Sequence, residues 1–542
     1  MSLSILPGIV EPFTNERPAA FADRIGRAYA LGTGAAHKKR LGQYLTPVAV
    51  ADFMASLIAC DRDVIRILDP GAGSGVLACA LVEALASRSR PPARIMIDAC
   101  EWDSEILPLL DQSLQYVQLR GESAGIEVSY RIIGEDFVLR HAAELRRGAS
   151  LFPIECDHAE YDAIIGNPPY FKIPKSDPRA IAAADLVHGQ PNIYSLFMGV
   201  SAALLAPGGE IVFITPRSFA SGPYFRRFRE RFFERTRLEA LHVFGSRRDA
   251  FSRDEVLQEN VILKARARTD ETPTKRDALV RVSVSRGAED IDRSATHMVP
   301  ITDLIDSTSE ELMLRIPSSA EDCTIISRID SWNGSLRRYG MEVSTGPVVP
   351  FRATEFLSDA HASGKDDAPL LWLQNVRPMR VEWPTSARRK PQYIAVRRDS
   401  MPLLVPDGNY VLLRRFSAKE EPRRLVAAPL LEGELNDGWI GIENHLNYIH
   451  REGRSLTKEE AVGLAAIYNS EIMDSYFRIL NGSTQVSATE IRRIPLPPHE
   501  LIIEIGRKAS ARRIEQAEVD ALIERSFDAV LHRAKGHAPC VS

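Results

Sequence analysis

Cysteine is scarce in this sequence, and the few cysteines lie far apart. No two of them form a Cys-x-x-Cys pair, so their spacing suggests neither a zinc site nor a disulfide framework. We therefore expect no bound metal. The six cysteines are Cys60, Cys79, Cys100, Cys156, Cys323 and Cys540.

Long apolar runs are missing as well. No stretch approaches the roughly 18 uninterrupted apolar residues that suggest a transmembrane helix. The first residues, MSLSILPGIVEPFTNERP, lack the basic start and the long apolar core of a secretory signal. These absences predict a cytoplasmic protein that does not associate with a membrane.

Neither sign of charge is in large excess, because the formal net charge is −4 at pH 7. The distribution is less even than the total. Residues 217–253 contain ten Arg and four acidic residues, and residues 377–424 contain twelve Lys or Arg and five acidic residues. Each run is either the solvated face of a helix or loop, or a local binding surface for a polyanion.

The order of apolar and amphipathic segments between about residues 65 and 265 predicts the fold class. Short apolar runs alternate there with longer amphipathic ones, which indicates βαβ units and a mostly parallel, doubly wound α/β sheet of the Rossmann type. Such sheets bind ligands at the carboxyl ends of their strands. The expected strands are 64–69, 94–101, 128–133, 161–166, 209–215, 238–244 and 260–266, and the expected helices are 47–58, 75–87, 104–119, 192–205 and 223–235.

A chain of 542 residues is too long for one ordinary core, so we expect at least two domains. After residue 266 the sequence becomes polar and rich in proline, with helical patterns only near 457–480 and 498–533. We place the first domain at 1–312, with its α/β core at about 35–266. Residues 313–542 are expected to form a second, mixed α+β domain.

A glycine-rich turn follows the first expected strand, in ILDPGAGSGVLACALVEAL (67–85). Gly71, Gly73 and Gly75 permit close backbone approach and positive φ. The strand ends in Asp69, which suits an ammonium group better than a phosphate. S-adenosylmethionine carries an ammonium and a sulfonium and no phosphate, so it is the cofactor that this turn favours. The alternative is a purely structural strand–turn–helix.

Acidic residues also follow the next two expected strands. Glu101 follows the second, where an acid can hold ribose hydroxyls in this fold. Asp136 follows the third, where its carboxylate can accept from an adenine amino group while the Phe137 backbone N–H meets a ring nitrogen. Either acid alone is more often a solvated residue at a strand end. Their occurrence after successive strands strengthens the prediction of a cofactor site.

The fourth expected strand ends in Asn167–Pro168–Pro169–Tyr170, where two successive prolines remove two backbone donors. An exocyclic amine such as adenine N6 is a poor nucleophile because its lone pair is delocalised. The Asn167 side-chain oxygen and the Pro168 carbonyl can each accept one N–H and so favour a pyramidal nitrogen. The Tyr170 ring can stack on the base.

These motifs together resemble the N6-adenine DNA methyltransferases of type II restriction–modification systems. RLGQYLTP (40–47), DPGAGSG (69–75) and NPPY (167–170) are similar to the family's cofactor and catalytic motifs, in the family's order. The resemblance covers roughly residues 35–265. It implies a site-specific enzyme that moves a methyl group from S-adenosylmethionine to adenine N6 in double-stranded DNA.

The resemblance also implies roles for residues outside the main motifs. Tyr44, Thr46 and Pro47 would close over the methionine end of the cofactor. Apart from the resemblance, Thr46 suits the N-cap and Pro47 the first turn of the helix expected at 47–58. AFSRDEVLQENVILKA resembles the segment whose aromatic residue holds a flipped base, which indicates Phe251. Phe244 is the competing candidate, although core packing at a strand end would also explain it.

The second half resembles the family more weakly, through segments 342–352, 409–428 and 482–497. They are similar to target-recognition domains, so residues 313–542 are expected to bind DNA and to select the site. The chain lacks a metal-dependent nuclease pattern. Any DNA cleavage is therefore expected from a separate cognate restriction endonuclease.

Three kinds of alternative remain open from the sequence. An NPPY motif also occurs in enzymes that methylate RNA adenine or protein glutamine. Cytosine N4 is another exocyclic amine, but its enzymes usually resemble a Ser-Pro-Pro-Tyr pattern. A non-catalytic DNA specificity subunit would be expected to have lost an acid, a glycine or Asn167, and all of these are present.

Overall fold

The computed structural model divides into two compact units, Met1–Ser318 and Ser319–Ser542, and each is described by itself. The sequence placed the domain boundary after residue 312. The structure describes residues 9–33, 45–146, 160–245, 259–269, 278–305, 311–359, 367–384, 390–417, 421–435, 438–481, 485–511 and 515–535.

One sheet organises the first unit. Over the described residues its nine strands lie in the order β3-β2-β1-β4-β5-β7-β6-β8-β9. The five strands from β3 to β5 are parallel, β7 runs antiparallel to β5 and to β6, and β9 runs antiparallel to β8. The strands are β1 Val64–Asp69, β2 Arg94–Cys100, β3 Glu127–Ile133, β4 Tyr161–Gly166, β5 Leu205–Pro216, β6 Thr236–Phe244, β7 Asn260–Ala267, β8 Leu279–Ser285 and β9 Ala295–Pro300.

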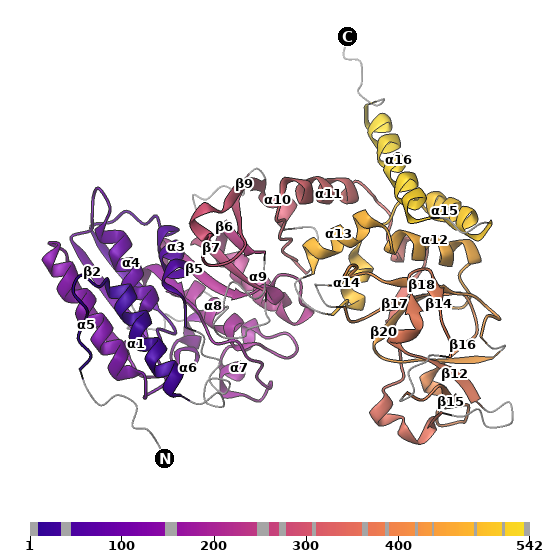
Figure 1. Ribbon diagram of the computed structural model, residues 1–542, viewed down its shortest axis with the longest axis horizontal. Helices are drawn as coiled ribbons and strands as arrows, with labels where there is room; N and C mark the ends of the chain where they lie inside the picture. Colours follow the sequence, from indigo (N-terminus) through magenta and orange to yellow (C-terminus); the bar gives the residue numbers. More distant parts are fainter. Residues whose placement is uncertain are drawn as a thin grey trace, which may run out of the picture. The chain divides into compact units, whose positions relative to one another are not determined.

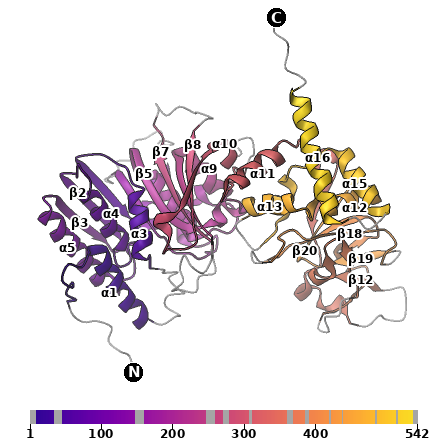
Figure 2. The ribbon, with the colours of Figure 1, turned by 45° about the horizontal axis from the view of Figure 1, so that its top comes forward.

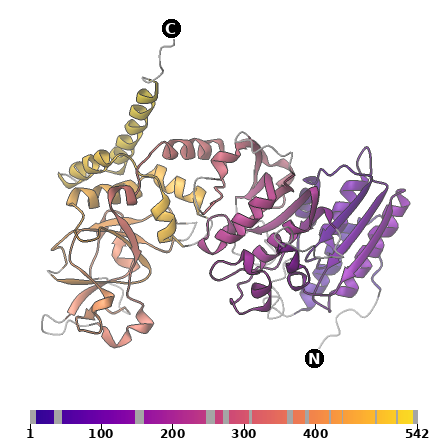
Figure 3. The ribbon, with the colours of Figure 1, turned by 180° about the vertical axis from the view of Figure 1, so that it is seen from behind.

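Helices cover both faces of this sheet, as a doubly wound fold requires (Figures 1 and 3). Helices α1, α3, α4 and α5 pack against one another, and α6, α7, α8 and α9 form a second group. The predicted Rossmann-like α/β class is therefore confirmed. The helices are α1 Pro18–Gly32, α3 Val48–Ser56, α4 Val76–Ala86, α5 Leu107–Ser123, α6 Phe137–His141, α7 Pro178–Ala182, α8 Ile193–Ala203, α9 Arg226–Arg235 and α10 Ile301–Leu304.

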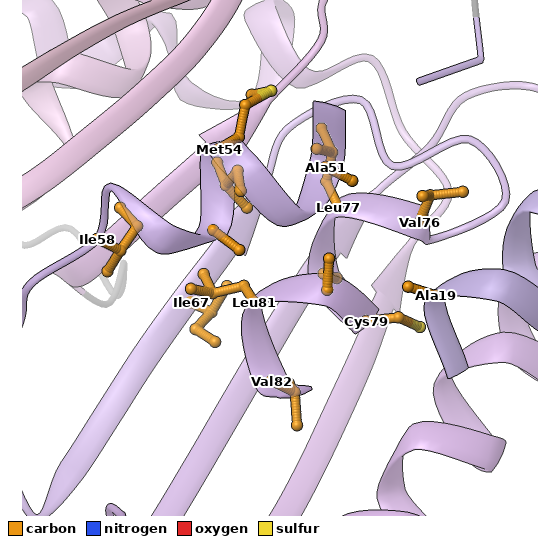
Figure 4. Close-up of a cluster of buried hydrophobic side chains, with 14 of the residues drawn as sticks. Ala19, Ala51, Met54, Ile58, Ile67, Val76, Leu77, Cys79, Leu81 and Val82 are labelled. Atoms are coloured by element: carbon orange, nitrogen blue, oxygen red, sulfur yellow. The ribbon is translucent and has the colours of Figure 1, made fainter. Parts of the chain in front are cut away.

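The core of the first unit lies on both faces of the sheet, because the side chains of each strand point alternately to one face and the other. Ile65 and Ile67 of β1 join a buried cluster with α3 and α4, whereas Leu68 is equally buried but lies outside that cluster. Because successive side chains of a strand point to opposite faces, Leu68 points towards the helices on the other face of the sheet. Ile67, Met54 of α3 and Leu81 of α4 all belong to this cluster (Figure 4).

The seven predicted strands and five predicted helices of the first unit are all present, with ends shifted by a few residues. Helices α1, α6, α7 and α10 and strands β8 and β9 were not predicted from the sequence. It was also wrong about the start of α3. The N-cap of that helix is Pro47, and no side chain caps it. Thr46 makes a different contact, described below.

The second unit combines small sheets with helices. Counted over its described residues, the sheets have the orders β10-β20-β17-β18, β11-β15-β12-β19-β16 and β13-β14. The unit is thus the mixed α+β structure that was expected. Its strands are β10 Glu342–Thr345, β11 Leu357–Ser358, β12 Asp367–Leu371, β13 Val376–Arg377, β14 Arg380–Val381, β15 Tyr393–Ala395, β16 Leu404–Pro406, β17 Tyr410–Arg414, β18 Ala427–Leu430, β19 Trp439–Ile442 and β20 Leu446–His450.

The helices of the second unit lie mostly towards its C-terminal end, where α12, α15 and α16 are packed together (Figure 2). The helical region expected at 457–480 is two helices, and so is the one expected at 498–533. The helices are α11 Ala320–Asp330, α12 Lys458–Tyr468, α13 Glu471–Leu480, α14 Ala488–Arg493, α15 His499–Ala511 and α16 Gln516–Lys535.

Glycines set the distance between α12 and α15. A Cβ atom added at Gly463 would overlap the Ile502 carbonyl oxygen, and one added at Gly506 would overlap the Glu459 carbonyl oxygen. The two helix backbones are therefore in direct contact, which no residue with a side chain would permit. This crossing fixes α15 against the core of the second unit.

We predict that Gly463→Ala destabilises the protein, although alanine is the better helix former by about 1 kcal/mol. Overlap with the Ile502 carbonyl should outweigh that gain and lower the free energy of unfolding by about 1–3 kcal/mol. Urea unfolding of the full chain measures the effect. Gly438→Ala is the matched control, because no atom lies within 4 Å of its added Cβ. A Gly463→Ala protein as stable as wild type would contradict the close-contact interpretation.

Candidate active site

The glycine-rich turn between β1 and α4 forms the base of the site. Gly73 has φ 53° and Gly75 has φ 88°, a left-handed conformation that suits glycine. The Ala72 amide donates to the carbonyl oxygen of Cys100, the last residue of β2 (2.9 Å). The turn therefore lies across the carboxyl ends of the first two strands.

Glu101 holds this turn from the end of β2. One carboxylate oxygen accepts from the Gly73 amide at 2.9 Å, and the other accepts from the Asp103 amide at 2.8 Å. Burial raises the pKa of Glu101, although these two amides oppose the shift. Each oxygen has further lone pairs, so the carboxylate can still accept from a ligand hydroxyl.

Asp69 is fully buried at the end of β1. Neither of its oxygens has a partner with hydrogen-bond geometry among the described residues. Burial raises the pKa of the Asp69 carboxyl to about 7; the nearby Gly71 amide lowers it and the charge of Glu101 raises it further. Pro70 and Gly71, the next two residues, line the cavity described below. A buried carboxylate without a partner is costly unless a cation or donor completes it.

Asp136 and Phe137 mark the start of α6. Asp136 is the N-cap, and its side chain accepts from the Leu139 amide at 3.0 Å. Its other oxygen lies 3.8 Å from the Arg179 guanidinium, which comes from α7. The Phe137 side chain is buried against Phe197 with ring centroids 5.0 Å apart.

A cavity of about 490 Å³ joins these strand ends. Its wall includes Gly71, Gly73, Glu101, Asp136 and Asn167, so it brings together sites that the sequence predicted separately. Most of the other lining residues are apolar. The lining residues that the sequence analysis missed are Leu45, Pro70, Cys100, Trp102, Asp103, Ile106, Glu135, Phe171, Arg179, Ile193 and Phe197.

Of the missed residues, Trp102 could have been found from the sequence, whereas Arg179 could not. Trp102 directly follows Glu101 and is 60% exposed, and a large exposed aromatic residue beside a predicted ribose site is a usable signal. Arg179 carries no such signal. Its guanidinium carbon lies 5.7 Å from the centre of the Phe171 ring, and its guanidinium is paired with Asp177 at 2.7 Å. Only the fold places this cation in the cavity wall.

The Asn167 side chain is held at both ends. Its Nδ2 donates to Thr46 Oγ1 at 3.0 Å, and its Oδ1 accepts from the Tyr170 hydroxyl. That hydroxyl also lies 3.0 Å from the Ile214 carbonyl oxygen. Asn167 and Pro169 line the cavity, whereas Pro168 is buried.

Tyr170 is 7% exposed and lies edge-on to Tyr194, with ring centroids 6.2 Å apart. Its ring is thus part of the core beneath the Asn167–Tyr170 motif, and its stacking on a base stays a prediction. Phe244 is buried in the core cluster beneath α3, as the packing interpretation of that residue requires. Tyr44 and Phe251 lie outside the described residues.

Thr46 and Pro47 are the last two residues of the segment 40–47 that resembles a cofactor motif. Thr46 is 5% exposed, and its hydroxyl accepts from Asn167 instead of capping α3. The preceding residue, Leu45, lines the cavity. Cofactor contacts by Thr46 and Pro47 stay predictions.

Comparison with known proteins assigns the chain to a protein family. Residues 127–251 match the Eco57I restriction-modification methylase family. Over 492 residues the chain is 34% identical to the type II methyltransferase M.PstI of Providencia stuartii, covering 90% of this chain and 93% of that protein. The type II methyltransferase M.BsuBI of Bacillus subtilis is 34% identical over 491 residues, which cover 90% and 94%. The chain belongs to the type II methyltransferase family.

A solved structure, the type IIG restriction endonuclease BpuSI, is similar at a TM-score of 0.45 with 14% identity, over 96% of this chain and 69% of that one. In the described ranges no three His, Cys, Asp or Glu side chains gather into a metal-binding group. No helix in the described part of the chain is both long and apolar enough to cross a membrane.

The cavity residues fit S-adenosylmethionine, the donor that the sequence predicts. The acids Glu101, Asp103, Glu135 and Asp136 outnumber the single base Arg179 in the wall, which suits a ligand carrying an ammonium and a sulfonium. The Asp69 carboxylate, which meets no partner with hydrogen-bond geometry within the described ranges, also suits a cation. Apolar side chains supply a surface for the adenine ring.

We predict that Asp69→Asn stabilises the ligand-free protein at high pH. Because the pKa of Asp69 in the folded protein is about 7, against an ordinary 3.8, the folded protein retains a proton that the unfolded chain has lost between these values. Stability therefore falls as pH rises through this window. The stability gain of Asp69→Asn over wild type should be about 2–3 kcal/mol larger at pH 8 than at pH 5.

Urea unfolding of both proteins at the two pH values measures this difference. Asp63→Asn is the control, because it makes the same substitution at a side chain that is 79% exposed. A gain for Asp69→Asn that is the same at both pH values would show that the buried carboxylate does not titrate as argued.

Proposed function

We propose that this type II methyltransferase transfers a methyl group from S-adenosylmethionine to the N6 amine of adenine in double-stranded DNA. The observation that carries the proposal is the cavity in whose wall the Asn167 side chain lies together with the glycine turn and Glu101. A methyl donor and an exocyclic amine must meet within bonding distance. A single cavity meets that requirement if one edge binds the methyl donor and the Asn167 side chain accepts a hydrogen bond from the amine.

The cofactor would be held by the acids at the strand ends. Asp69 would balance the ammonium group, Glu101 would accept from the ribose hydroxyls, and Asp136 with the Phe137 amide would hold the adenine. Arg179 would add a cation beside the adenine, over whose face a guanidinium is attracted. When bound, S-adenosylmethionine supplies a methyl group made electrophilic by its sulfonium.

The chain's contribution to the chemical step would come from two acceptors. Asn167 Oδ1 and the Pro168 carbonyl would each accept one N–H of the amine, which favours a pyramidal nitrogen with its lone pair free. The prolines stiffen the backbone, so the acceptors are in place before the reaction. This chemistry requires no metal and no strong general base.

A base inside a duplex cannot reach the edge of a sheet, so the target adenine would leave the stack. Tyr170 and Phe251 are the residues proposed to hold it by ring stacking. For Tyr170 this requires its ring to move away from its edge-on contact with Tyr194. The second unit would bind the duplex and select the site, and a separate restriction endonuclease would cleave unmodified DNA.

We predict that Asn167→Ala slows methylation much more than it weakens binding. The loss of one preorganised acceptor should lower the single-turnover rate by roughly 10²–10³. The affinities for S-adenosylmethionine and for DNA should stay within a few-fold of wild type. Single-turnover methylation, calorimetry with cofactor and mass spectrometry of the modified nucleoside together measure these effects.

The nucleoside analysis also identifies the product. N6-methyladenine in duplex DNA supports the proposal, whereas N4-methylcytosine or a preference for RNA would contradict it. An Asn167→Ala enzyme that methylates at the wild-type rate would refute the proposed mechanism regardless of the product.

We predict that DNA affinity depends strongly on salt and on Arg397 and Arg398. Both side chains are exposed and belong to the basic run at 377–424. Log affinity should fall linearly with log salt concentration, and removing a phosphate contact should reduce the slope by about 0.9. Arg397→Ala/Arg398→Ala should therefore flatten the slope in a fluorescence-anisotropy titration of the full chain.

Arg507→Ala/Lys508→Ala is the matched control. It removes the same charge from an exposed pair on α15, where Lys508 is already paired with Glu504 at 2.6 Å. Equal slopes for the two double variants would show that the basic run does not contact phosphate through these residues.

A further inference from the structure

The fold divides the basic run at 377–424 into buried and accessible arginines. Arg424 is 2% exposed, and its guanidinium donates to the side chains of Ser417 and Asn481 at 3.1 Å each. This arginine therefore belongs to the interior of the second unit. Four other arginines of the run are exposed or half-buried, and we call them the arginine edge: Arg377, Arg380, Arg414 and Arg415.

Strand pairing brings the arginine edge together at one end of the sheet β10-β20-β17-β18. The hairpin β13–β14 carries Arg377 opposite Arg380. At its tip the Met379 amide donates to the Ala427 carbonyl oxygen at 2.9 Å, and Ala427 pairs with Leu413 near the end of β17. The hairpin therefore lies beside the end of β17, where the other two arginines of the edge follow.

Backbone carbonyl groups hold the two arginines at the end of β17. Arg414 Nε donates to the Val376 carbonyl oxygen at 2.8 Å, and Arg415 Nη1 donates to the Asn444 carbonyl oxygen at 2.9 Å. Neither guanidinium forms an ion pair with a carboxylate in the described part of the chain. Because a guanidinium has five N–H donors, each retains several for a ligand.

The arginine edge places like charges close together. Burial lowers the pKa of Arg414, and the nearby charge of Arg377 lowers it further, although Glu421 acts in the opposite direction. Arg377 and Arg380 share one carboxylate, that of Glu382, at 3.4 and 2.6 Å. Neighbouring charges of one sign destabilise the folded protein. An anion bound at this edge would offset that cost.

The turn that precedes β20 supports Arg415. A Cβ atom added at Gly346 would lie 2.3 Å from the Glu443 carbonyl oxygen, so two backbone segments are in direct contact at this turn. The Arg415 amide donates to the His445 carbonyl oxygen at 2.9 Å. The His445 ring is exposed and is held by the buried Glu443 carboxylate. Groups fixed in this way lose little conformational entropy when they bind a ligand.

We infer that the arginine edge is a phosphate-binding surface of the second unit, at which Arg377 and Arg415 contact the backbone of double-stranded DNA. The inference rests on the proposed function, because it takes DNA as the partner. Planar guanidinium groups match pairs of phosphate oxygens, and phosphates recur along the duplex. The surface is separate from Arg397 and Arg398, which follow β15 in another sheet.

The test replaces arginine by glutamine, which removes the charge and keeps a hydrogen-bond donor. In the full chain, Arg415→Gln and Arg377→Gln should each reduce the slope of log affinity against log salt concentration by about 0.9. The ratio of wild-type to variant affinity should therefore fall about threefold to fourfold between roughly 50 and 200 mM salt. Fluorescence anisotropy with a labelled duplex measures the slopes.

Two variants serve as controls. Arg415→Lys keeps the charge and should keep the wild-type slope. Arg338→Gln makes the same substitution outside the arginine edge, at an exposed residue that also donates to a backbone carbonyl group, that of Asn333, at 2.9 Å. Its slope should equal that of wild type.

Slopes for Arg415→Gln and Arg377→Gln equal to that of Arg338→Gln would overturn the inference. An Arg415→Lys protein that changes as much as Arg415→Gln would also overturn it, because the side chain would then act through the structure and not through its charge. An affinity loss confined to the methylated sequence, with no change in slope, would indicate a base contact and would reject the phosphate contact.

The outcomes separate this inference from the proposed function. If the wild-type protein forms no N6-methyladenine in duplex DNA, the proposed function fails, whatever the slopes are. If the wild-type protein forms N6-methyladenine but Arg415→Gln and Arg377→Gln keep the wild-type slope, the proposed function stands and only the role of the arginine edge is rejected.

Discussion

The parallel register of β1 with its two neighbours is the constraint on which the site depends. Asp69 pairs in register with Ala99 of β2, and Leu68 pairs with Ile164 of β4. Three strands far apart in sequence therefore end at one edge, and the residues that follow them face one cavity. A shift of one residue would turn every side chain of a strand to the opposite face. The apolar layers on both faces of β1 thus fix the position of the chemistry.

This arrangement has a cost in folding free energy at one residue, Asp69. Asp69 is buried, neither of its oxygens has a partner with hydrogen-bond geometry in the described part of the chain, and burial raises its pKa towards neutrality. Glu101 holds the turn that follows Asp69, because its carboxylate accepts a hydrogen bond from the Gly73 amide. A carboxylate with unmet bonding capacity is poorly placed for stability and well placed for a cationic ligand. Completion of this group by a ligand would favour the bound state without any rearrangement of the turn.

Much of this site was predictable because its motifs are local. The turn from Asp69 to Gly75 and the run from Asn167 to Tyr170 each need only a few adjacent residues to be recognised. The Asn167–Thr46 contact spans 121 residues, and no local pattern encodes it. Arg179 enters the cavity wall in a similar way, through the folded path of the chain after the Asn167–Tyr170 motif.

The same distinction explains the fold predictions. The strands from β1 to β7 were found because short apolar runs, separated by longer amphipathic segments, mark most of them. The missed strand β8, LVRVSVS, alternates buried and exposed residues for much of its length, a weaker signal that a test for period two could have detected. Strands of the second unit are two to five residues long. Many of these strands pair with strands that are far away in the sequence, as β12 does with β19.

The proposed chemistry finally bears on where sequence selectivity can reside. Asn167 Oδ1 and the Pro168 carbonyl would contact an amine that is identical in every adenine of a genome. A site of that kind can reject a base without an exocyclic amine, but it cannot tell one adenine from another. Discrimination between sequences must therefore come from contacts with neighbouring base pairs. The second unit, which contains the basic run at 377–424, is the part of the chain that we propose for that role.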